Sequence, residues 1–197
     1  NGKPILDKSR LGFILKEDTL AGHLEITEAL HHSFSGTWEQ IWGEDRIVEN
    51  NYHEMTIRVQ KTSAPKRKFN VVFRLFNDGF GFRYEFPEQE ALKDFVIMDE
   101  LTEFALTGDH KAWSIPYEAH FYEALYEASP ASKLGWVSTP LTMETNDGLF
   151  LSIHEANLTD YAAMNLIPKE GSMTLKANLT PWSTGEKVFM KAPGVTP

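Results

Sequence analysis

The sequence predicts an all-β, mainly antiparallel protein with at most one or two short helices. Two observations support this fold class: apolar and polar residues alternate along several short segments, and turn residues separate those segments. Alternation with a period of two places the apolar side chains on one face of a strand, as in a half-buried sheet. Many short strands with few helices indicate a sandwich of packed sheets.

The segment 53–60 shows the alternation most clearly. Met55, Ile57 and Val59 would lie on one face, and the polar residues between them on the other. This pattern predicts a half-buried strand. Further strands are predicted at three shorter apolar runs: Leu11–Leu15, Phe95–Met98 and Met173–Leu179.

Two Asn-Asp-Gly triplets predict tight turns. The first, at 77–79, separates the aromatic-rich runs 69–76 and 80–86, and the second, at 146–148, precedes the apolar run 149–153. Asn, Asp and Gly tolerate the positive φ that hairpin turns need. We therefore expect a β-hairpin over 69–86 and a turn before 149–153.

One short helix is predicted over 117–128. Tyr117, Phe121 and Leu125 recur at helical spacing, and Pro116 stands where proline is tolerated at a helix start.

The chain is expected to form a single domain over residues 1–190, because no internal repeat or low-complexity tract divides it. Residues 191–197 include Pro193, Gly194 and Pro197 and are predicted to begin a linker. The first residues contain neither an initiating Met nor a signal peptide. Both ends therefore suggest a domain taken from a longer protein.

Composition excludes several functions. The 19 Lys and Arg residues are outnumbered by 28 Asp and Glu, giving a net charge of −9, so we expect no nucleic-acid partner. The lack of cysteine excludes disulfides, thiolate zinc sites and cysteine nucleophiles. No run approaches the roughly 18 apolar residues of a membrane span, so none is expected.

Catalytic motifs are not found. His53-Glu54 and His154-Glu155 each lack the second histidine of a zinc-peptidase helix, and no Gly-x-Ser-x-Gly elbow occurs. Tryptophans could serve as sugar-stacking platforms, although large aromatic side chains are more often buried. The five are Trp38, Trp42, Trp113, Trp136 and Trp182.

The strand predicted at 149–153 ends in polar residues. The face that carries Leu151 and Ile153 continues to Glu155 and Asn157. Such a face either emerges into water or enters a polar site, and the strand pattern alone favours the end that emerges into water.

A series of motifs spread over most of the chain resembles the N-terminal domain of glycoside hydrolase family 97. In order, the motifs are Ser9-Arg10-Leu11-Gly12, Thr37-Trp38, Trp42-Gly43-Glu44, Asn50-Asn51-Tyr52-His53-Glu54, the run from Phe73 to Pro87, Thr102-Glu103-Phe104, Thr139-Pro140-Leu141-Thr142 and the run from His154 to Tyr161. The resemblance implies a large β-super-sandwich that is followed, in the family, by a catalytic (β/α)8 barrel.

The resemblance also implies a function. Family members hydrolyse α-linked glucosides or galactosides with calcium in the active site, and their two catalytic carboxylates lie on the barrel, so no catalytic residue is expected here. Glu155 is implied as a calcium ligand, shared with the barrel of the same polypeptide because calcium takes six to eight oxygens. Asn157 and Trp113 are candidates for the rim that faces an α-linked oligosaccharide. The parent protein is expected in the periplasm.

Two alternatives stay open. The chain could be an autonomous carbohydrate-binding β-sandwich with an exposed Trp platform, or a scaffold that only docks against neighbouring domains.

Overall fold

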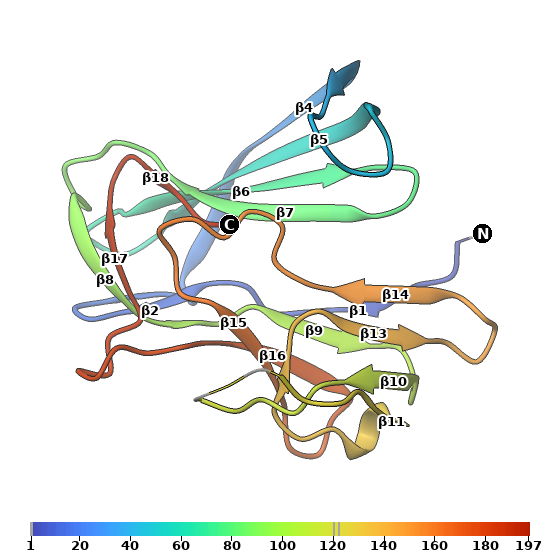
Figure 1. Ribbon diagram of the computed structural model, residues 1–197. Coiled ribbons are helices and arrows are strands. Elements are labelled where there is room, and N and C mark those ends of the chain that lie inside the picture. Colours follow the sequence, from blue (N-terminus) through green and yellow to red (C-terminus); the bar gives the residue numbers. More distant parts are fainter. Residues whose placement is uncertain (1, 120, 122) are drawn as a thin grey trace. The chain divides into compact units, whose positions relative to one another are not determined.

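The structure, a computed structural model, describes residues 2–119, 121 and 123–197. It is built from antiparallel strands, which confirms the predicted fold class (Figure 1). The helical part of the described residues is one 3-10 turn, η1 (Ala131–Lys133). Within those residues, no helix is long and apolar enough to cross a membrane.

The chain divides into two compact units, the first of which comprises Asn1–Ala21 and Phe95–Met190. Its strands form three sheets, and β8 and β17 each extend by one residue into the other unit. One sheet has the order β1 (Leu6–Asp7), β9 (Glu103–Leu106), β16 (Thr174–Leu179), β15 (Met164–Pro168) and β12 (Val137–Ser138). The next, called sheet D, has the order β11 (Glu127–Pro130), β10 (Lys111–Ser114), β13 (Leu141–Glu144) and β14 (Phe150–Ile153). The third has the order β17 (Val188–Lys191), β8 (Asp94–Glu100), β2 (Phe13–Leu15) and β3 (Thr19–Leu20).

The second unit comprises Gly22–Asp94 and Lys191–Pro197 and contains a single sheet. Its order is β18 (Gly194–Val195), β7 (Phe80–Phe86), β6 (Lys68–Leu75), β5 (Ile47–Lys61) and β4 (Leu24–Glu39). The strand predicted at 53–60 is the inner part of β5.

Each unit has its own apolar core, because alternate strand residues point inward. In the first unit the fully buried large side chains include Phe13, Leu20, Ile97, Leu141, Met143, Leu166 and Leu179. In the second unit Phe69 contacts both Tyr84 and Phe86, with ring centroids 6.3 Å apart in each pair. All three of these aromatic residues are buried.

Both predicted turns join paired strands. Leu75 pairs with Phe80 across the first turn, where the Phe76 N–H donates to the Gly79 carbonyl at 2.8 Å. Glu144 pairs with Phe150 across the second turn. There Gly148 has φ 82°, in the left-handed region that favours glycine.

The helix predicted over 117–128 is wrong for the part of it that the structure describes. His120 and Tyr122 lie outside the described residues, and the others form no helical turn. The last two, Glu127 and Ala128, begin β11, where Ala128 pairs with Trp113. Phe121 and Leu125 are exposed, so the helical spacing buries no apolar face and sheet pairing prevails.

Residues predicted as the start of a linker take part in the sheet of the second unit. Gly194 pairs with Phe86 in β18, and the Tyr84 N–H donates to the Thr196 hydroxyl at 2.9 Å. The single-domain boundaries proposed from the sequence stay a prediction.

Candidate site around Glu155

Residues 154–163, called the 154–163 loop, connect β14 to β15 in the first unit. Oε2 of Glu155 accepts a hydrogen bond from the Met164 N–H at 3.0 Å, so the start of the loop is tied to its end. The Thr180 N–H donates to the Ala163 carbonyl at 3.0 Å and holds the same end against the residue after β16. These bonds fix the position of the Glu155 carboxylate.

Glu155 is half-buried, and burial raises the pKa of its carboxyl although the Met164 N–H opposes this shift. Its second oxygen, Oε1, accepts no hydrogen bond from the residues that the structure describes. A partly desolvated carboxylate with one open oxygen would gain from a nearby cation.

A second, more deeply buried carboxylate belongs to the same surroundings. Glu100, at the end of β8, accepts hydrogen bonds from the Thr102 hydroxyl at 2.6 Å and from the Tyr161 hydroxyl at 2.7 Å. Burial raises the pKa of Glu100, the two hydroxyls counteract the shift, and the negative charges of Glu155 and Asp99 add to it. Because Tyr161 belongs to the 154–163 loop, its bond to Glu100 anchors the middle of that loop.

Calcium fits Glu155 as one ligand of a shared site. Calcium takes six to eight oxygens, whereas the described part of the chain contains no cluster of three or more acidic or histidine side chains that could hold a metal. Both oxygens of Glu100 already accept hydrogen bonds. Glu155 alone therefore offers an open carboxylate oxygen here, and the remaining ligands would have to come from outside these residues.

The two predicted rim residues lie near this loop by connectivity. Asn157 is exposed within the loop. Trp113, on β10, pairs with Thr142 of β13, which pairs with Ser152 of β14, three residues before Glu155. Trp113 therefore lies across sheet D from the end of β14, where the loop begins. Within the residues that the structure describes, no hydrogen bond or ring contact joins it to Glu155.

Trp113 contributes to an aromatic pair on one face of sheet D. Its ring stacks on Phe150, with centroids 6.0 Å apart and planes inclined by 21°. The ammonium of Lys111 lies 4.5 Å from the centre of the Trp113 ring, within the range of a cation–π contact. Phe150 is exposed, so this pair is accessible from solvent.

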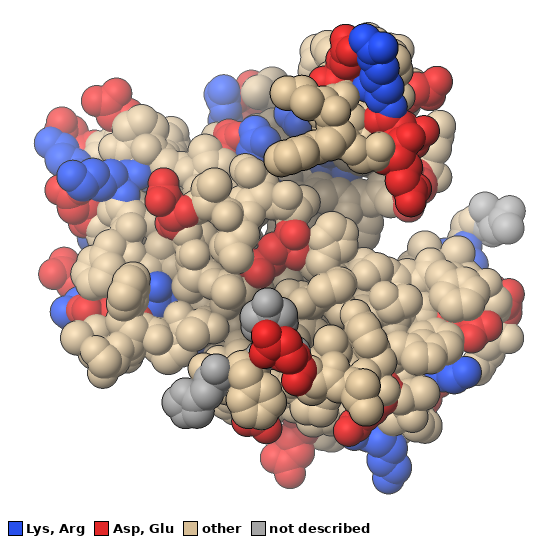
Figure 2. All heavy atoms as spheres, viewed as in Figure 1, with Lys and Arg blue, Asp and Glu red and all other residues tan. Residues whose placement is uncertain are grey.

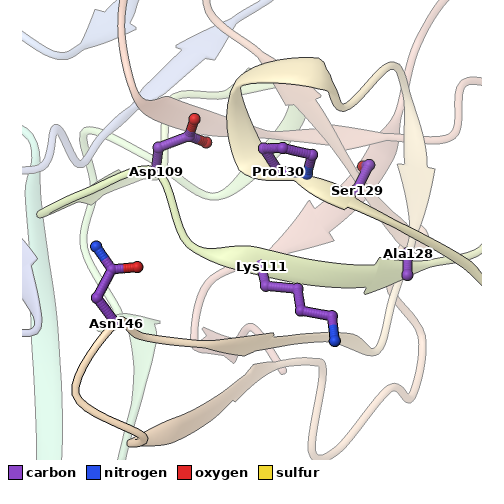
Figure 3. Close-up of a pocket in the computed structure, with 6 residues that line it drawn as sticks. All are labelled: Asp109, Lys111, Ala128, Ser129, Pro130 and Asn146. Atoms are coloured by element: carbon purple, nitrogen blue, oxygen red, sulfur yellow. The ribbon is translucent and has the colours of Figure 1, made fainter.

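A shallow pocket of about 290 Å³ lies beside this face (Figure 3). Lys111 extends from β10 between the strand β11 and Asn146 of the turn after β13. Asp109 is held by the backbone N–H and the hydroxyl of Ser132, both at 2.8 Å, and these bonds lower its pKa. The other lining residues are Ala128, Ser129 and Pro130.

Sequence reasoning missed Glu100 and Tyr161 as members of the site. A regular strand that buries Phe95 and Ile97 would also turn position 99 inward, whereas the structure buries Glu100. The register explains the difference: Ile14 pairs with Asp99 but Leu15 pairs with Ile97, so β8 contains one extra residue at a bulge. The signal that could have found the site is the Asp160-Tyr161 motif, whose tyrosine binds this carboxylate.

Charged side chains do not form a single patch on the face shown in Figure 2, where acidic and basic groups are interspersed. The site is therefore defined by one half-buried carboxylate and its supporting hydrogen bonds. The fold and this site together describe an all-β domain with one half-buried carboxylate that is open at Oε1.

A family model described as Glycosyl-hydrolase 97 N-terminal matches residues 1–192. The chain belongs to this family, and its homologues are larger glycoside hydrolase family 97 enzymes in which such a domain accompanies a catalytic domain.

The relatives extend well beyond this chain. A retaining alpha-galactosidase from Bacteroides thetaiotaomicron is 25% identical over 92% of the chain and 28% of its own length. A Glycoside Hydrolase Family 97 enzyme from Pseudoalteromonas sp. strain K8, solved in complex with acarbose, is 36% identical with a TM-score of 0.95. That match covers all of this chain and 30% of the enzyme. A beta-arabinopyranosidase shares the fold at 21% identity and a TM-score of 0.89.

Proposed function

We propose that this chain is the non-catalytic N-terminal domain of a glycoside hydrolase that acts on α-glucosides or α-galactosides. In this proposal it packs on a catalytic barrel of the same polypeptide and supplies Glu155 as a calcium ligand in the active site. The observation that carries it is the Glu155 carboxylate, which is half-buried, fixed by the Met164 N–H and open at Oε1. The acarbose complex of the Pseudoalteromonas enzyme supports an α-glucoside-like ligand.

Each residue of the site has a defined task in this proposal. The Met164 N–H orients Glu155, and the bond between Tyr161 and Glu100 holds the loop that carries it. Calcium, when bound, supplies positive charge that can engage substrate hydroxyls. Asn157 is exposed on the same loop and would offer its amide to the sugar. The parent enzyme is proposed to act in the periplasm.

The test is Glu155→Gln in the full-length enzyme, measured as the calcium concentration needed for half-maximal hydrolysis of an aryl α-glucoside and an aryl α-galactoside. Loss of a charged ligand should raise this concentration by about tenfold or more. Glu170→Gln is the matched control, because Glu170 is exposed in the turn between β15 and β16. Calcium dependence equal to that of the control would reject the assignment of Glu155.

Sheet D favours a second candidate, an autonomous carbohydrate-binding surface. The stacked pair of Trp113 and the exposed Phe150 offers ring area, and Lys111 and Asn146 offer hydrogen-bonding groups beside it. Titration with maltooligosaccharides should then give a saturable change in Trp fluorescence. The change should be lost in Trp113→Ala and kept in the control Trp182→Ala. A signal that Trp113→Ala leaves intact would reject this face as the sugar site.

A further inference from the structure

The outer part of the β4–β5 hairpin is a two-stranded ribbon in the second unit. β4 and β5 pair from Leu24↔Lys61 to Glu39↔Ile47. β6 pairs with β5 only between His53↔Leu75 and Gln60↔Lys68. Residues 34–52, called the distal ribbon, therefore extend past the third strand, and among the described residues no further strand pairs with them (Figure 1).

One face of the distal ribbon carries most of its large apolar side chains. Phe34 pairs with Tyr52 and Trp38 pairs with Val48, so these four side chains project from the same face. The rings of Phe34 and Tyr52 are stacked with centroids 5.5 Å apart. The Tyr52 ring also contacts Phe76, with centroids 5.5 Å apart, and the Arg74 guanidinium lies 4.4 Å from its centre. Farther out on the same face, Trp38 remains 50% exposed.

The tip of the ribbon is more exposed still. Ile41 is 102% and Trp42 87% exposed in the connection between β4 and β5. An isolated two-stranded hairpin is marginally stable in water, and large apolar side chains gathered on an exposed surface mark an interaction site. The distal ribbon thus has the composition and the geometry of an element that is covered by another surface.

We propose that the distal ribbon docks on the catalytic domain that follows this domain in the full-length enzyme. This inference rests on the proposed function, in which such a domain belongs to the same polypeptide. The relatives supply the occupant, since this chain covers only about 30% of the Pseudoalteromonas enzyme and 28% of the Bacteroides enzyme.

The covalent link favours this tethered partner over a second copy of the chain. A stable interface between separate molecules has to bury about 800 Å² on each side. A covalently linked domain is held at an effective concentration in the millimolar range, so a small apolar contact is sufficient.

The ribbon also specifies the charge of its partner. Glu39 forms an ion pair with Arg46 at 2.6 Å, whereas Glu44, Asp45 and Glu49 leave the ribbon acidic overall. The catalytic domain should therefore present an apolar groove with lysine or arginine at its margin.

Tryptophan footprinting of the full-length enzyme tests the docking directly. Oxidative labelling followed by mass spectrometry gives a rate for each tryptophan, and Trp182, which is 64% exposed in the first unit, serves as the internal reference. Trp38 and Trp42 should react about tenfold more slowly than Trp182, because docked side chains are labelled only after local opening. Reaction rates of Trp38 and Trp42 similar to that of Trp182 would overturn the proposal.

Two controls identify the occupant. Protection of Trp38 and Trp42 that survives dilution supports the linked domain, whereas protection lost on dilution points to a second copy and overturns the proposal. Trp38→Arg should restore rapid labelling of Trp42, and continued protection of Trp42 in that variant would overturn the role of the apolar face. The calcium dependence of Glu155→Gln is read separately, so docking and metal binding can fail independently.

Discussion

The 154–163 loop and the distal ribbon differ in the kind of group that they leave without a partner, polar in the loop and apolar in the ribbon. In the loop, a polar group is drawn partly into the protein: Glu155 is half-buried and holds one open carboxylate oxygen. In the ribbon, apolar groups are exposed: Trp38 lies on the part of β4 that extends past β6, and Trp42 lies in the connection between β4 and β5. Both features are typical of a surface that contacts another domain. There a carboxylate can complete its ligands with groups from the neighbour, and exposed aromatic side chains can become buried.

The largest expected effect contrasts the ribbon with the core of the same sheet. Phe86→Ala removes a ring that is 1% exposed and should lower the free energy of unfolding by about 3–5 kcal/mol. Trp42→Ala, at the exposed tip, should change it by about 0.5 kcal/mol or less in this chain. Urea denaturation of both variants measures the difference. Comparable losses would show that the ribbon is part of the folded core.

The next effect concerns a carboxylate in the first unit that has all its partners. Asp99 accepts hydrogen bonds from Lys176 at 2.5 Å and from Lys187 at 2.8 Å. Burial would raise the pKa of Asp99, but the hydrogen bonds and the positive charges of the two lysines together hold the pKa below its ordinary value.

Asp99→Asn leaves two part-buried ammonium groups without their anion and should cost about 1–3 kcal/mol in urea denaturation. The loss of stability should be greatest above the ordinary pKa of aspartate. A carboxyl with a lowered pKa stabilises the protein there, and this stabilisation disappears as the pH falls through the lowered pKa of the folded state. The exposed Asp78→Asn in the turn after β6 is the control. A cost no larger than that of the control would contradict this account of Asp99.

A smaller effect is expected from Glu100. Because its pKa is raised, its contribution to stability changes with pH in the opposite direction to that of Asp99. An acid that holds its proton more tightly in the native state makes the free energy of unfolding fall as pH rises from its ordinary pKa of 4.5 to the raised value. Glu100→Gln removes this dependence. In calcium-free buffer, the free energy of unfolding of the variant should therefore rise relative to that of the wild type as the pH increases. Urea denaturation at several pH values measures it, and parallel pH profiles would refute the buried-carboxyl account.

The smallest effect lies at the surface. The ammonium of Lys3, 2.7 Å from Asp147, together with the Thr145 hydroxyl, lowers the pKa of Asp147 to about 2. Lys3→Ala should move this pKa toward the ordinary value of 3.8, as measured by NMR titration of the Asp147 carboxyl. An unchanged pKa would mean that Thr145 and the local backbone are responsible for the shift.

The sequence predicted those parts of the fold in which local signals and tertiary packing agree. The hairpin over 69–86 follows from aromatic alternation on both sides of a turn, and the structure pairs those strands residue by residue. All of β4 and the outer end of β5 were missed, because residues 24–39 and 47–52 bury almost no side chains and therefore give no strong burial pattern.

The candidate site was predicted only through its family motif. Glu155 is a candidate because of the motif His154-Glu155-Ala156, whereas alternation alone favoured a strand end that emerges into water. Glu100 was not predicted as a buried residue, because a bulge in β8 reverses the face on which it lies. A bulge has no regular sequence signal. The helix prediction was wrong for the described residues of 117–128. Helical spacing is a local signal, whereas the pairing of Ala128 with Trp113 depends on another strand.

The most direct test of the central claim, that this domain completes a neighbouring active site, is a crystal structure of the full-length enzyme with calcium. A carboxylate oxygen of Glu155 should lie about 2.3–2.6 Å from the ion, with the remaining protein ligands supplied by the catalytic domain. A fully coordinated calcium ion with Glu155 outside its coordination sphere would contradict it.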